Sequence, residues 1–242
     1  MRTLAILVLI VAPLAVAGTP DMTPVTADQV VTKMALHNLQ RQTHLGGYQG
    51  MRLYVLENDR LKKHAEMLVR TTCSPDGTKH FDILSERGWK EAANHVFRKM
   101  LESEEKLSLP SGKDRTQLSE SNYRFRMIDT EELNGRPTYV LEISPKRKDQ
   151  FLIKGRIWVD ANEYALARVE GVPAKRPSFW VRDTNFTQIY DKQGGFWFAK
   201  RTQSVNHVLF FGRTEVMIFY LNYEPIQLRP VTTEVSEQVT AP

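Results

Sequence analysis

The chain has 242 residues, and its 33 Lys and Arg against 28 Asp and Glu give a formal net charge of +5 at pH 7. The hydrophobic share of 41% and the charged share of 25% are typical of a folded globular protein, and a chain of this length buries enough surface to fold without disulfide bonds. Cys73 is the only cysteine, which excludes an intrachain disulfide, and we interpret it as a small buried side chain.

The N-terminus has the pattern of a secretory signal. Arg2 precedes an apolar run at residues 4–12, and Pro13 and Ala15-Val16-Ala17 follow it. We predict a signal peptide at residues 1–17 that is cleaved before Gly18. A retained anchor is the alternative, although the run is shorter than the roughly 20 residues that span a bilayer. Since residue 18 is not cysteine, we expect a periplasmic, soluble protein without a lipid anchor, and export disfavours nucleic-acid binding.

A helix and three strands are expected in the first third of the mature chain. Thr26-Ala27-Asp28-Gln29 has the form of a capping box, which predicts a helix to about residue 42. Gly46-Gly47 is expected to end this helix. Alternating apolar residues then predict strands at 49–57, 65–72 and 79–84.

Residues 89–107 change from an alternating to a helical pattern. Their apolar residues recur every three or four positions, at Trp89, Ala92, Ala93, Val96, Phe97, Met100 and Leu101. This spacing predicts an amphipathic helix inserted between strands, whose apolar stripe packs on the sheet. The polar and small residues of 109–120 indicate a mobile loop.

The remaining chain is dominated by a β meander from Tyr123 to Tyr223. Period-two alternation, separated by turns such as Asn134-Gly135, predicts strands at 123–130, 137–144, 154–160, 165–172, 181–190, 196–205 and 213–223. We therefore expect an α+β fold with one large curved antiparallel sheet. A single domain is predicted at residues 18–226, followed by a disordered tail at 227–242.

No pattern typical of an enzyme is present. The six histidines are scattered without metal-binding spacing, and there is neither a phosphate-binding glycine loop nor a nucleophile elbow. We predict no catalytic residue, no metal and no cofactor, although folding could still bring together a carboxylate pair such as Asp160 and Asp183. The basic run Lys146-Arg147-Lys148 is interpreted as a solvated loop, with contact to anionic lipid head groups as the alternative.

Three consecutive segments carry a family resemblance. Tyr139-Val140-Leu141-Glu142-Ile143-Ser144-Pro145-Lys146 ends in a Pro-Lys turn, Ile153-Lys154-Gly155-Arg156-Ile157-Trp158-Val159-Asp160 ends in Val-Asp, and Ala167-Arg168-Val169 returns immediately. With the order of the predicted elements, these segments resemble the LolA/LolB-like family of outer-membrane lipoprotein-sorting proteins. The resemblance implies an unclosed β-barrel of about eleven strands, with helices covering the concave face and an apolar cavity between them.

The resemblance also implies a non-enzymatic periplasmic carrier of a lipid or of lipoprotein acyl chains, in transient contact with membrane or envelope proteins. An envelope-stress sensor or envelope-assembly module similar to the RseB regulators, which binds a protein partner, is the alternative. The same side chains could form an ordinary filled core. The candidate cavity residues are Leu53, Val55, Met67, Val69, Phe125, Met127, Leu141, Ile143, Ile157 and Val159, and the candidate lid residues are Trp89, Val96, Phe97 and Met100.

Overall fold

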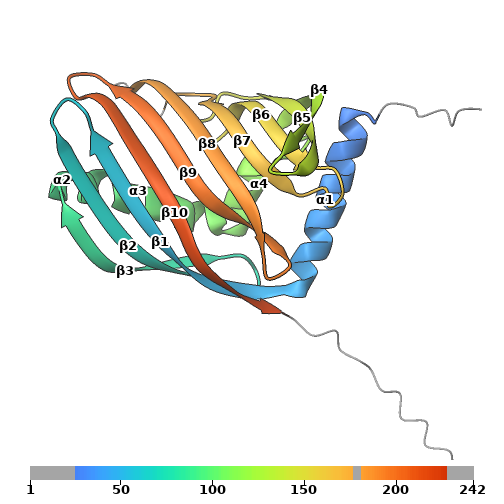
Figure 1. Cartoon of the computed structure of the whole chain (residues 1–242), viewed down its shortest axis with the longest axis horizontal. Helices are drawn as coiled ribbons and strands as arrows, with labels where there is room; N and C mark the ends of the chain where they lie inside the picture. The colour runs from blue at the N-terminus through green and yellow to red at the C-terminus, as the bar shows by residue number, and fades with distance from the viewer. Residues whose placement is uncertain (1–24, 177–180, 228–242) are drawn as a thin grey trace, which may run out of the picture.

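The computed structural model describes residues 25–176 and 181–227, so the predicted signal peptide and most of the predicted tail lie outside the described residues. The described chain forms one ten-stranded antiparallel sheet that does not close, with helices packed on it (Figure 1). Its strands are β1 (Leu45–Asn58), β2 (Lys63–Cys73), β3 (Lys79–Gly88), β4 (Tyr123–Leu133), β5 (Arg136–Pro145), β6 (Ile153–Asp160), β7 (Leu166–Pro173), β8 (Val181–Gln193), β9 (Phe196–Val208) and β10 (Gly212–Gln227). The α+β class and the unclosed sheet are confirmed, with ten described strands where the resemblance implies about eleven.

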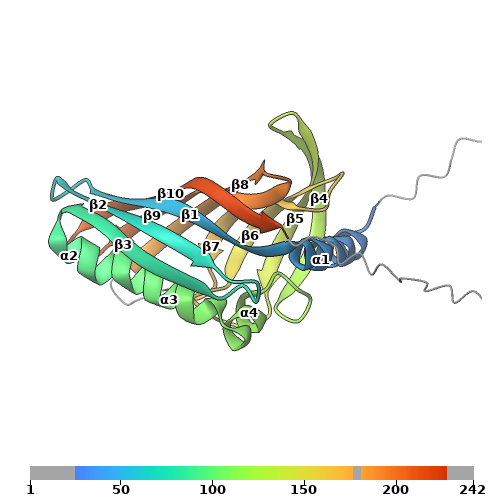
Figure 2. The ribbon, with the colours of Figure 1, turned by 90° about the horizontal axis from the view of Figure 1, so that it is seen from below.

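The strand order is β3-β2-β1-β10-β9-β8-β7-β6-β5-β4, so the last strand lies beside the first. The sheet curves over the helices, as Figure 2 shows. Directly paired residues of antiparallel strands point to the same face. One such row crosses nine strands, from Met67 through Tyr54, Ile218, Thr202, Gln188, Val169, Ile157 and Leu141 to Met127. We call the face that carries this row the inner face.

Helix α1 (Ala27–His44) begins at the predicted capping box. The Thr26 side chain accepts from Gln29 N at 3.3 Å, and Gln29 Oε1 accepts from Thr26 N at 3.0 Å. The helix continues to His44, and the two glycines that were expected to end it lie inside β1. Val30, Val31 and Met34 are buried against β4 to β7, so α1 covers one end of the inner face.

The predicted inserted helix is present as three joined segments, α2 (Lys90–Ala92), η1 (Ala93–Phe97) and α3 (Arg98–Ser108). The η1 segment is π-helical. Trp89 caps the start of this helix rather than belonging to it. We call residues 90–108 the lid helix. The expected loop at 109–120 instead contains a short helix, α4 (Pro110–Thr116), which starts with proline at its first position, where the missing N–H is not needed.

Candidate functional site

The inner face carries two separate apolar cores, one at each end of the sheet. The first core joins β1, β2 and β10 to the lid helix, with Tyr54, Met67, Val69 and Phe97 almost completely buried. The second joins β5, β6 and β7 to α1, with Leu141, Ile143, Ile157 and Val159 at 0% exposure. Both ends of the inner face are therefore filled by side chains of the protein itself.

The sequence-predicted residues divide between these cores. The first contains Met67, Val69 and Phe97, with Trp89, Val96 and Met100 packed against it, and the second contains Leu141, Ile143, Ile157 and Val159, with Phe125 and Met127 packed against it. Leu53 and Val55 belong to neither. They pair with Leu68 and Glu66 of β2, on the face opposite to Tyr54. The two cavity residues predicted on β1 therefore point outward, not towards the inner face. Their neighbours Arg52 and Tyr54 point inward instead.

Between the two cores, the middle of the inner face is only half-buried. Among the residues of β8 whose side chains the structure describes, none is buried, although β8 has strands on both sides. Phe186 and Tyr190 of β8 face inward and reach the second core from this open side. A central strand of a ten-stranded sheet is thus left accessible on its inner face.

Small and polar side chains surround Phe186 on this middle part. Phe186 pairs with Ser204 of β9 on one side and with Gly171 of β7 on the other, and Gly171 pairs with Gly155 of β6. In the neighbouring row, Gln188 pairs with Thr202, whose Oγ1 lies 3.1 Å from the Tyr220 hydroxyl. We call these inward residues of the middle strands, Gly155, Gly171, Phe186, Gln188, Tyr190, Thr202, Ser204 and Tyr220, the middle strip. It combines aromatic rings with hydroxyl and amide groups.

A charged cluster lies where the middle strip meets the lid helix. Arg52 of β1, whose side chain is only 3% exposed, places Nη1 2.7 Å from Glu104 Oε2 of α3. Lys79 of β3 places Nζ 2.7 Å from Glu104 Oε1. The Arg52 guanidinium is stacked between two rings, at 5.1 Å from the Phe81 centroid and 4.8 Å from the Tyr220 centroid. Two cations and one carboxylate leave this cluster with a net charge of +1.

The pKa values in the cluster show how strongly its members are coupled. Burial alone would raise the pKa of Glu104, but Lys79 and Arg52 outweigh it and lower the pKa to about 2. Burial alone would lower the pKa of Lys79 and of Arg52, and the same carboxylate raises both instead. All three groups are therefore charged at neutral pH. Burial also raises the pKa of Tyr220 and Tyr190, which keeps their hydroxyls protonated.

An aromatic cluster continues from the charged cluster towards the start of β1. Phe198 and Tyr223 stack with centroids 4.2 Å apart, and Tyr48 meets both rings edge-on at 5.1 and 5.3 Å. Gly50 makes room for this arrangement, because a Cβ there would lie 3.3 Å from Cδ1 of Tyr223. Aromatic side chains therefore extend along the inner face beside the charged groups.

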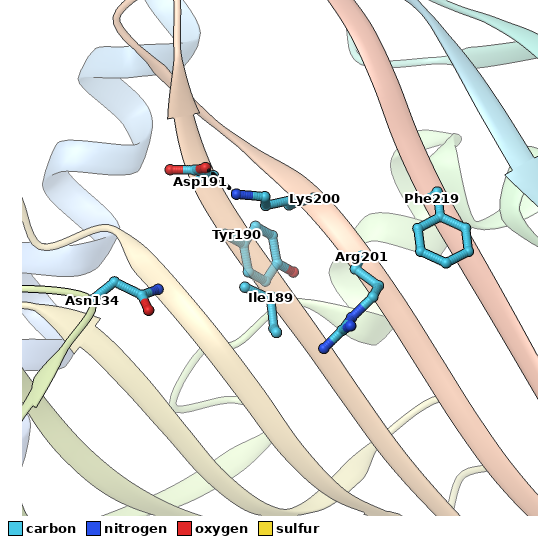
Figure 3. A pocket seen from close by; sticks show the side chains of 7 residues that line it. All are labelled: Asn134, Ile189, Tyr190, Asp191, Lys200, Arg201 and Phe219. Atoms are coloured by element: carbon cyan, nitrogen blue, oxygen red, sulfur yellow. Dashed lines mark hydrogen bonds and ion pairs between the residues drawn. The ribbon is translucent and has the colours of Figure 1, made fainter.

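Two hollows of the described surface lie mainly outside the inner face, although Tyr190 of the middle strip borders the first of them. The first, of about 370 Å³, is open to solvent and is lined by Asn134, Ile189, Tyr190, Asp191, Lys200, Arg201 and Phe219 (Figure 3). Ile189, Arg201 and Phe219 are paired across β8, β9 and β10 on the outer face. The second hollow, of about 540 Å³, lies between the β2–β3 turn and α4 and includes Cys73 and Lys113. In the second hollow, burial raises the pKa of the Cys73 thiol, so this sulfur is protonated at neutral pH.

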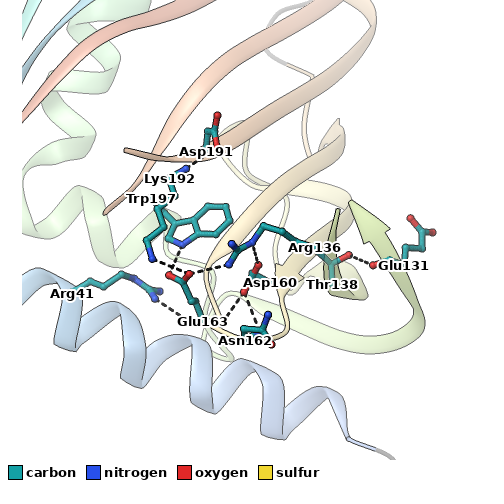
Figure 4. Close-up of polar contacts among 10 residues, drawn as sticks. All are labelled: Arg41, Glu131, Arg136, Thr138, Asp160, Asn162, Glu163, Asp191, Lys192 and Trp197. Carbon is teal, nitrogen blue, oxygen red and sulfur yellow. Dashed lines mark hydrogen bonds and ion pairs between the residues drawn. The ribbon is translucent and has the colours of Figure 1, made fainter. Parts of the chain in front are cut away.

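A polar network fixes the β6–β7 turn and the end of α1 (Figure 4). Asp160 is 0% exposed and accepts from Arg136 Nε and from the backbone N–H of Asn162 and Glu163. Arg41 of α1 donates to the backbone oxygen of Glu163 at 2.9 Å. Asp160 is thus satisfied by Arg136 of β5 and by the backbone of its own turn. Asp183, near the start of β8, lies opposite His207 of β9, so the two carboxylates do not form a pair.

The basic run at residues 146–148 is partly used in local contacts. Lys146 donates to Glu120 O, and Arg147 donates to Asn122 Oδ1 and lies 3.8 Å from Asp149. These contacts hold the β5–β6 turn against residues 115–122, which agrees with the interpretation as a surface loop. Within residues 25–176 and 181–227, no group of His, Cys, Asp or Glu could hold a metal ion. No helix of the described chain is long and apolar enough to cross a bilayer.

No family model matches the chain, and no curated protein matches it. Its structure is similar to a DUF1329 family protein from Desulfovibrio piger, at 13% identity over 82% of this chain and 92% of that chain, with a TM-score of 0.44. It is also similar to a domain assigned to outer membrane lipoprotein sorting from Vibrio parahaemolyticus, at 15% identity, 85% and 93% coverage and a TM-score of 0.42. A LolA superfamily protein from Nitrosomonas europaea follows, at 11% identity, 86% and 96% coverage and a TM-score of 0.38. Since a fold does not determine a function, the ligand must be inferred from the side chains of this chain.

Proposed function

We propose that this protein is an exported, non-enzymatic carrier that binds a lipid, or the acyl chain of a lipoprotein, on the middle strip of its inner face. The observation that supports this most is that Phe186 and Tyr190, which face inward on a central strand, are only half-buried. Apolar surface left in water costs about 25 cal/mol per Å². An acyl chain laid along the strip removes this surface from water between the two filled cores.

The composition of the strip fits an amphipathic ligand. Phe186 and the rings of Tyr190 and Tyr220 offer apolar surface, while the half-buried Gln188 offers hydrogen-bonding groups. Sites for small ligands typically combine mostly apolar walls with a few placed polar groups. Each CH₂ of an acyl chain moved out of water contributes about 0.8 kcal/mol, so even a short chain provides strong binding.

The lid helix is placed to control access to the strip. Its buried side chains, chiefly Phe97 and Leu101, contact the sheet through apolar surfaces, which have no fixed directionality. Its middle is a π-helical segment, a conformation often found at functional positions in helices. Movement of the lid would break a limited set of polar contacts with the sheet. These are the ion pairs of Glu104 with Arg52 and Lys79, those of Arg98 with Glu86 and of Glu105 with His80, and the hydrogen bond from Lys79 N to Ser108 Oγ.

The proposed location is the periplasm. It is supported by the signal pattern at residues 1–17 and by the absence of cysteine at position 18. A lipid carrier in this compartment needs no cofactor, because transfer changes only the surroundings of the acyl chain.

Titration with a fluorescent fatty acid tests the proposal. We expect saturable binding by the protein purified from the periplasm, at least tenfold weaker binding by Phe186→Ser, and unchanged binding by Ile189→Ser. Both residues are half-buried on β8, but Ile189 faces outward, so it is a matched control for the loss of apolar surface. Absence of binding by the unmodified protein, or equal loss in both variants, would contradict the proposal.

A further inference from the structure

Two hairpins place exposed apolar side chains at one end of the sheet. The β1–β2 hairpin carries Leu61, which is 39% exposed. The β9–β10 hairpin carries Phe210 and Phe211, which are 74% and 46% exposed. Figure 1 shows the two hairpins side by side at the same end of the molecule. We call residues 59–63 and 208–213 together the hairpin tips.

Asn58 holds the two tips together. It is 3% exposed, and its Nδ2 donates to Phe211 O at 2.9 Å and to Thr214 Oγ1 at 2.7 Å. Its Oδ1 accepts from Leu61 N at 2.7 Å. A single buried amide therefore joins the turn that carries Leu61 to the turn that carries Phe211.

An ion pair and a close backbone contact add to this connection. Asp59 N donates to Arg213 O at 3.1 Å, and the two side chains form an ion pair at 3.0 Å. Gly212 has φ +73°, and a Cβ there would lie 3.2 Å from Cβ of Arg60. The tips thus form one body in which the apolar side chains have fixed positions relative to each other.

The backbone at Phe210 is unusual for an aromatic residue. Its φ of +67° lies in the left-handed region, which disfavours any side chain larger than that of glycine. A phenylalanine that is both 74% exposed and held in this conformation lowers solubility and local stability at once. With 74% of its surface exposed, Phe210 presents an aromatic ring that can contact an apolar environment outside the protein.

The charge of the tips is strongly positive. They contain Arg60, Lys62, Lys63 and Arg213 against Asp59, so four basic and one acidic residue give a net charge of +3. Asp59 is paired with Arg213, and none of the other three basic residues forms an ion pair with a described residue. Exposed phenylalanine beside unpaired lysine and arginine is the combination that binds the head-group region of anionic bilayers.

We propose that the hairpin tips dock this protein onto the surface of an anionic lipid bilayer. Phe210, Phe211 and Leu61 insert among the head groups, while Arg60, Lys62 and Lys63 contact lipid phosphates. A protein partner fits less well, because stable protein interfaces bury about 800 Å² on each side, which is more than three side chains at a narrow tip present. The inference goes beyond the proposed function and does not depend on the middle strip.

The hairpin tips lie close to the start of the lid helix. Lys63 and His64 begin β2, and His64 O accepts from Trp89 N at 2.7 Å, directly before the lid helix. Figure 1 shows α2 at the same end as both hairpins. Docking therefore brings the start of the lid helix close to the bilayer.

Flotation with lipid vesicles tests the docking surface. The protein is purified from the periplasm and mixed with vesicles of phosphatidylcholine alone or with added phosphatidylglycerol. We expect flotation only with the anionic vesicles, and at least a tenfold lower partition coefficient for Phe210→Ser/Phe211→Ser and for Lys62→Glu/Lys63→Glu.

Matched variants test whether vesicle binding depends on the hairpin tips or on the total exposed apolar area and total charge of the protein. Leu36→Ser/Leu39→Ser removes two exposed apolar side chains from α1, and Lys146→Glu/Lys148→Glu makes the same charge change in the β5–β6 turn. Both should float like the unmodified protein. No flotation of the unmodified protein, or an equal loss in the matched variants, would overturn the docking proposal. Fatty-acid binding by the Phe210→Ser/Phe211→Ser variant should stay unchanged, which distinguishes failure of docking from failure of ligand binding.

Discussion

Arg52 of β1 and Glu104 of α3 form a 2.7 Å ion pair that joins the inner face of the sheet to the lid helix. The arginine side chain is 3% exposed, whereas that of the glutamate is 31% exposed. Lys79 binds the other carboxylate oxygen, so Glu104 is the common partner of two cations. This carboxylate is therefore the main polar link between the sheet and the helix that covers it.

Replacing Glu104 by Gln should lower the free energy of unfolding by about 2 to 3 kcal/mol, because a buried arginine is left without its counterion. Urea unfolding at pH 7 measures this. Glu105→Gln is the matched control, since the half-exposed Glu105 carboxylate forms an ion pair with His80 at 3.4 Å and with no other described residue. A loss of stability in Glu104→Gln no larger than that of the control would contradict this role of the pair.

Because of the Glu104 carboxylate, we expect the free energy of unfolding to depend on pH. The pKa of Glu104 is lowered to about 2 in the folded protein, against an ordinary value of about 4.3 when unfolded. Because the folded-state pKa is the lower one, the stabilisation is present at neutral pH and is lost as the pH falls from the unfolded value towards the folded one. The stability difference between the unmodified protein and Glu104→Gln should thus narrow in urea unfolding between about pH 5 and pH 2. If this stability difference stayed constant over that pH range, the stabilisation would not come from the Glu104 carboxylate.

Asn58→Ala should separate the hairpin tips. The substitution removes the donor to Phe211 O and Thr214 Oγ1 and the acceptor for Leu61 N. We expect a loss of about 2 to 3 kcal/mol in urea unfolding and weaker flotation with anionic vesicles. Asn94→Ala, which removes a single exposed contact with Arg98 at 3.2 Å, should change neither measurement. Normal flotation by Asn58→Ala would show that docking does not need the joined tips.

Phe210→Gly should separate stability from membrane binding. Glycine adopts the φ of +67° without steric cost, so the free energy of unfolding should stay constant or rise by up to about 1 kcal/mol. Flotation with anionic vesicles should fall at the same time, because the most exposed apolar side chain of the tips is removed. A variant that is clearly less stable would mean that the Phe210 side chain has a structural role instead.

Most of the sheet could be predicted from residue alternation. The strand pairs from β4 to β7 follow the period-two pattern closely, and the inward positions Met127, Leu141, Ile157 and Val169 form one row as their alternation requires. The capping box at Thr26 also predicted the start of α1 correctly. A local sequence pattern is enough to predict these features, because they depend on residues that are neighbours in the sequence or on directly paired strands.

The inward face of β1 was harder to predict because both of its faces carry apolar residues. Leu53 and Val55 alternate with Tyr54 and Leu56, so hydrophobicity alone does not choose between the two sets. Because Arg52 is charged, the sequence suggested that the face of β1 that carries it is exposed to solvent. Its charge is balanced by Glu104, which lies 52 positions along the chain on another element. Only the folded arrangement shows that a buried arginine marks the inward face.

The contact between the two hairpin tips could not be predicted from the sequence pattern. Phe210 and Phe211 continue a stretch rich in aromatic residues, and such residues favour strands over turns. The predicted strands at 196–205 and 213–223 nevertheless left them between two strands, where the structure has a turn. The sequence pattern did not show that this turn lies beside a hairpin about 150 residues earlier, to which Asn58 connects it. Pairing between the first and last strands of the sheet brings the two turns together.

Mass spectrometry of the molecules bound to the protein tests the central claim most directly. The protein would be purified from the bacterial periplasm without detergent, and its bound lipids would be extracted and quantified together with those of Phe186→Ser and Ile189→Ser. We predict about one phospholipid or acylated peptide per protein, strongly reduced in Phe186→Ser and retained in Ile189→Ser. A folded protein free of lipid, which also takes up no fatty acid, would contradict the carrier function and direct attention to a protein partner.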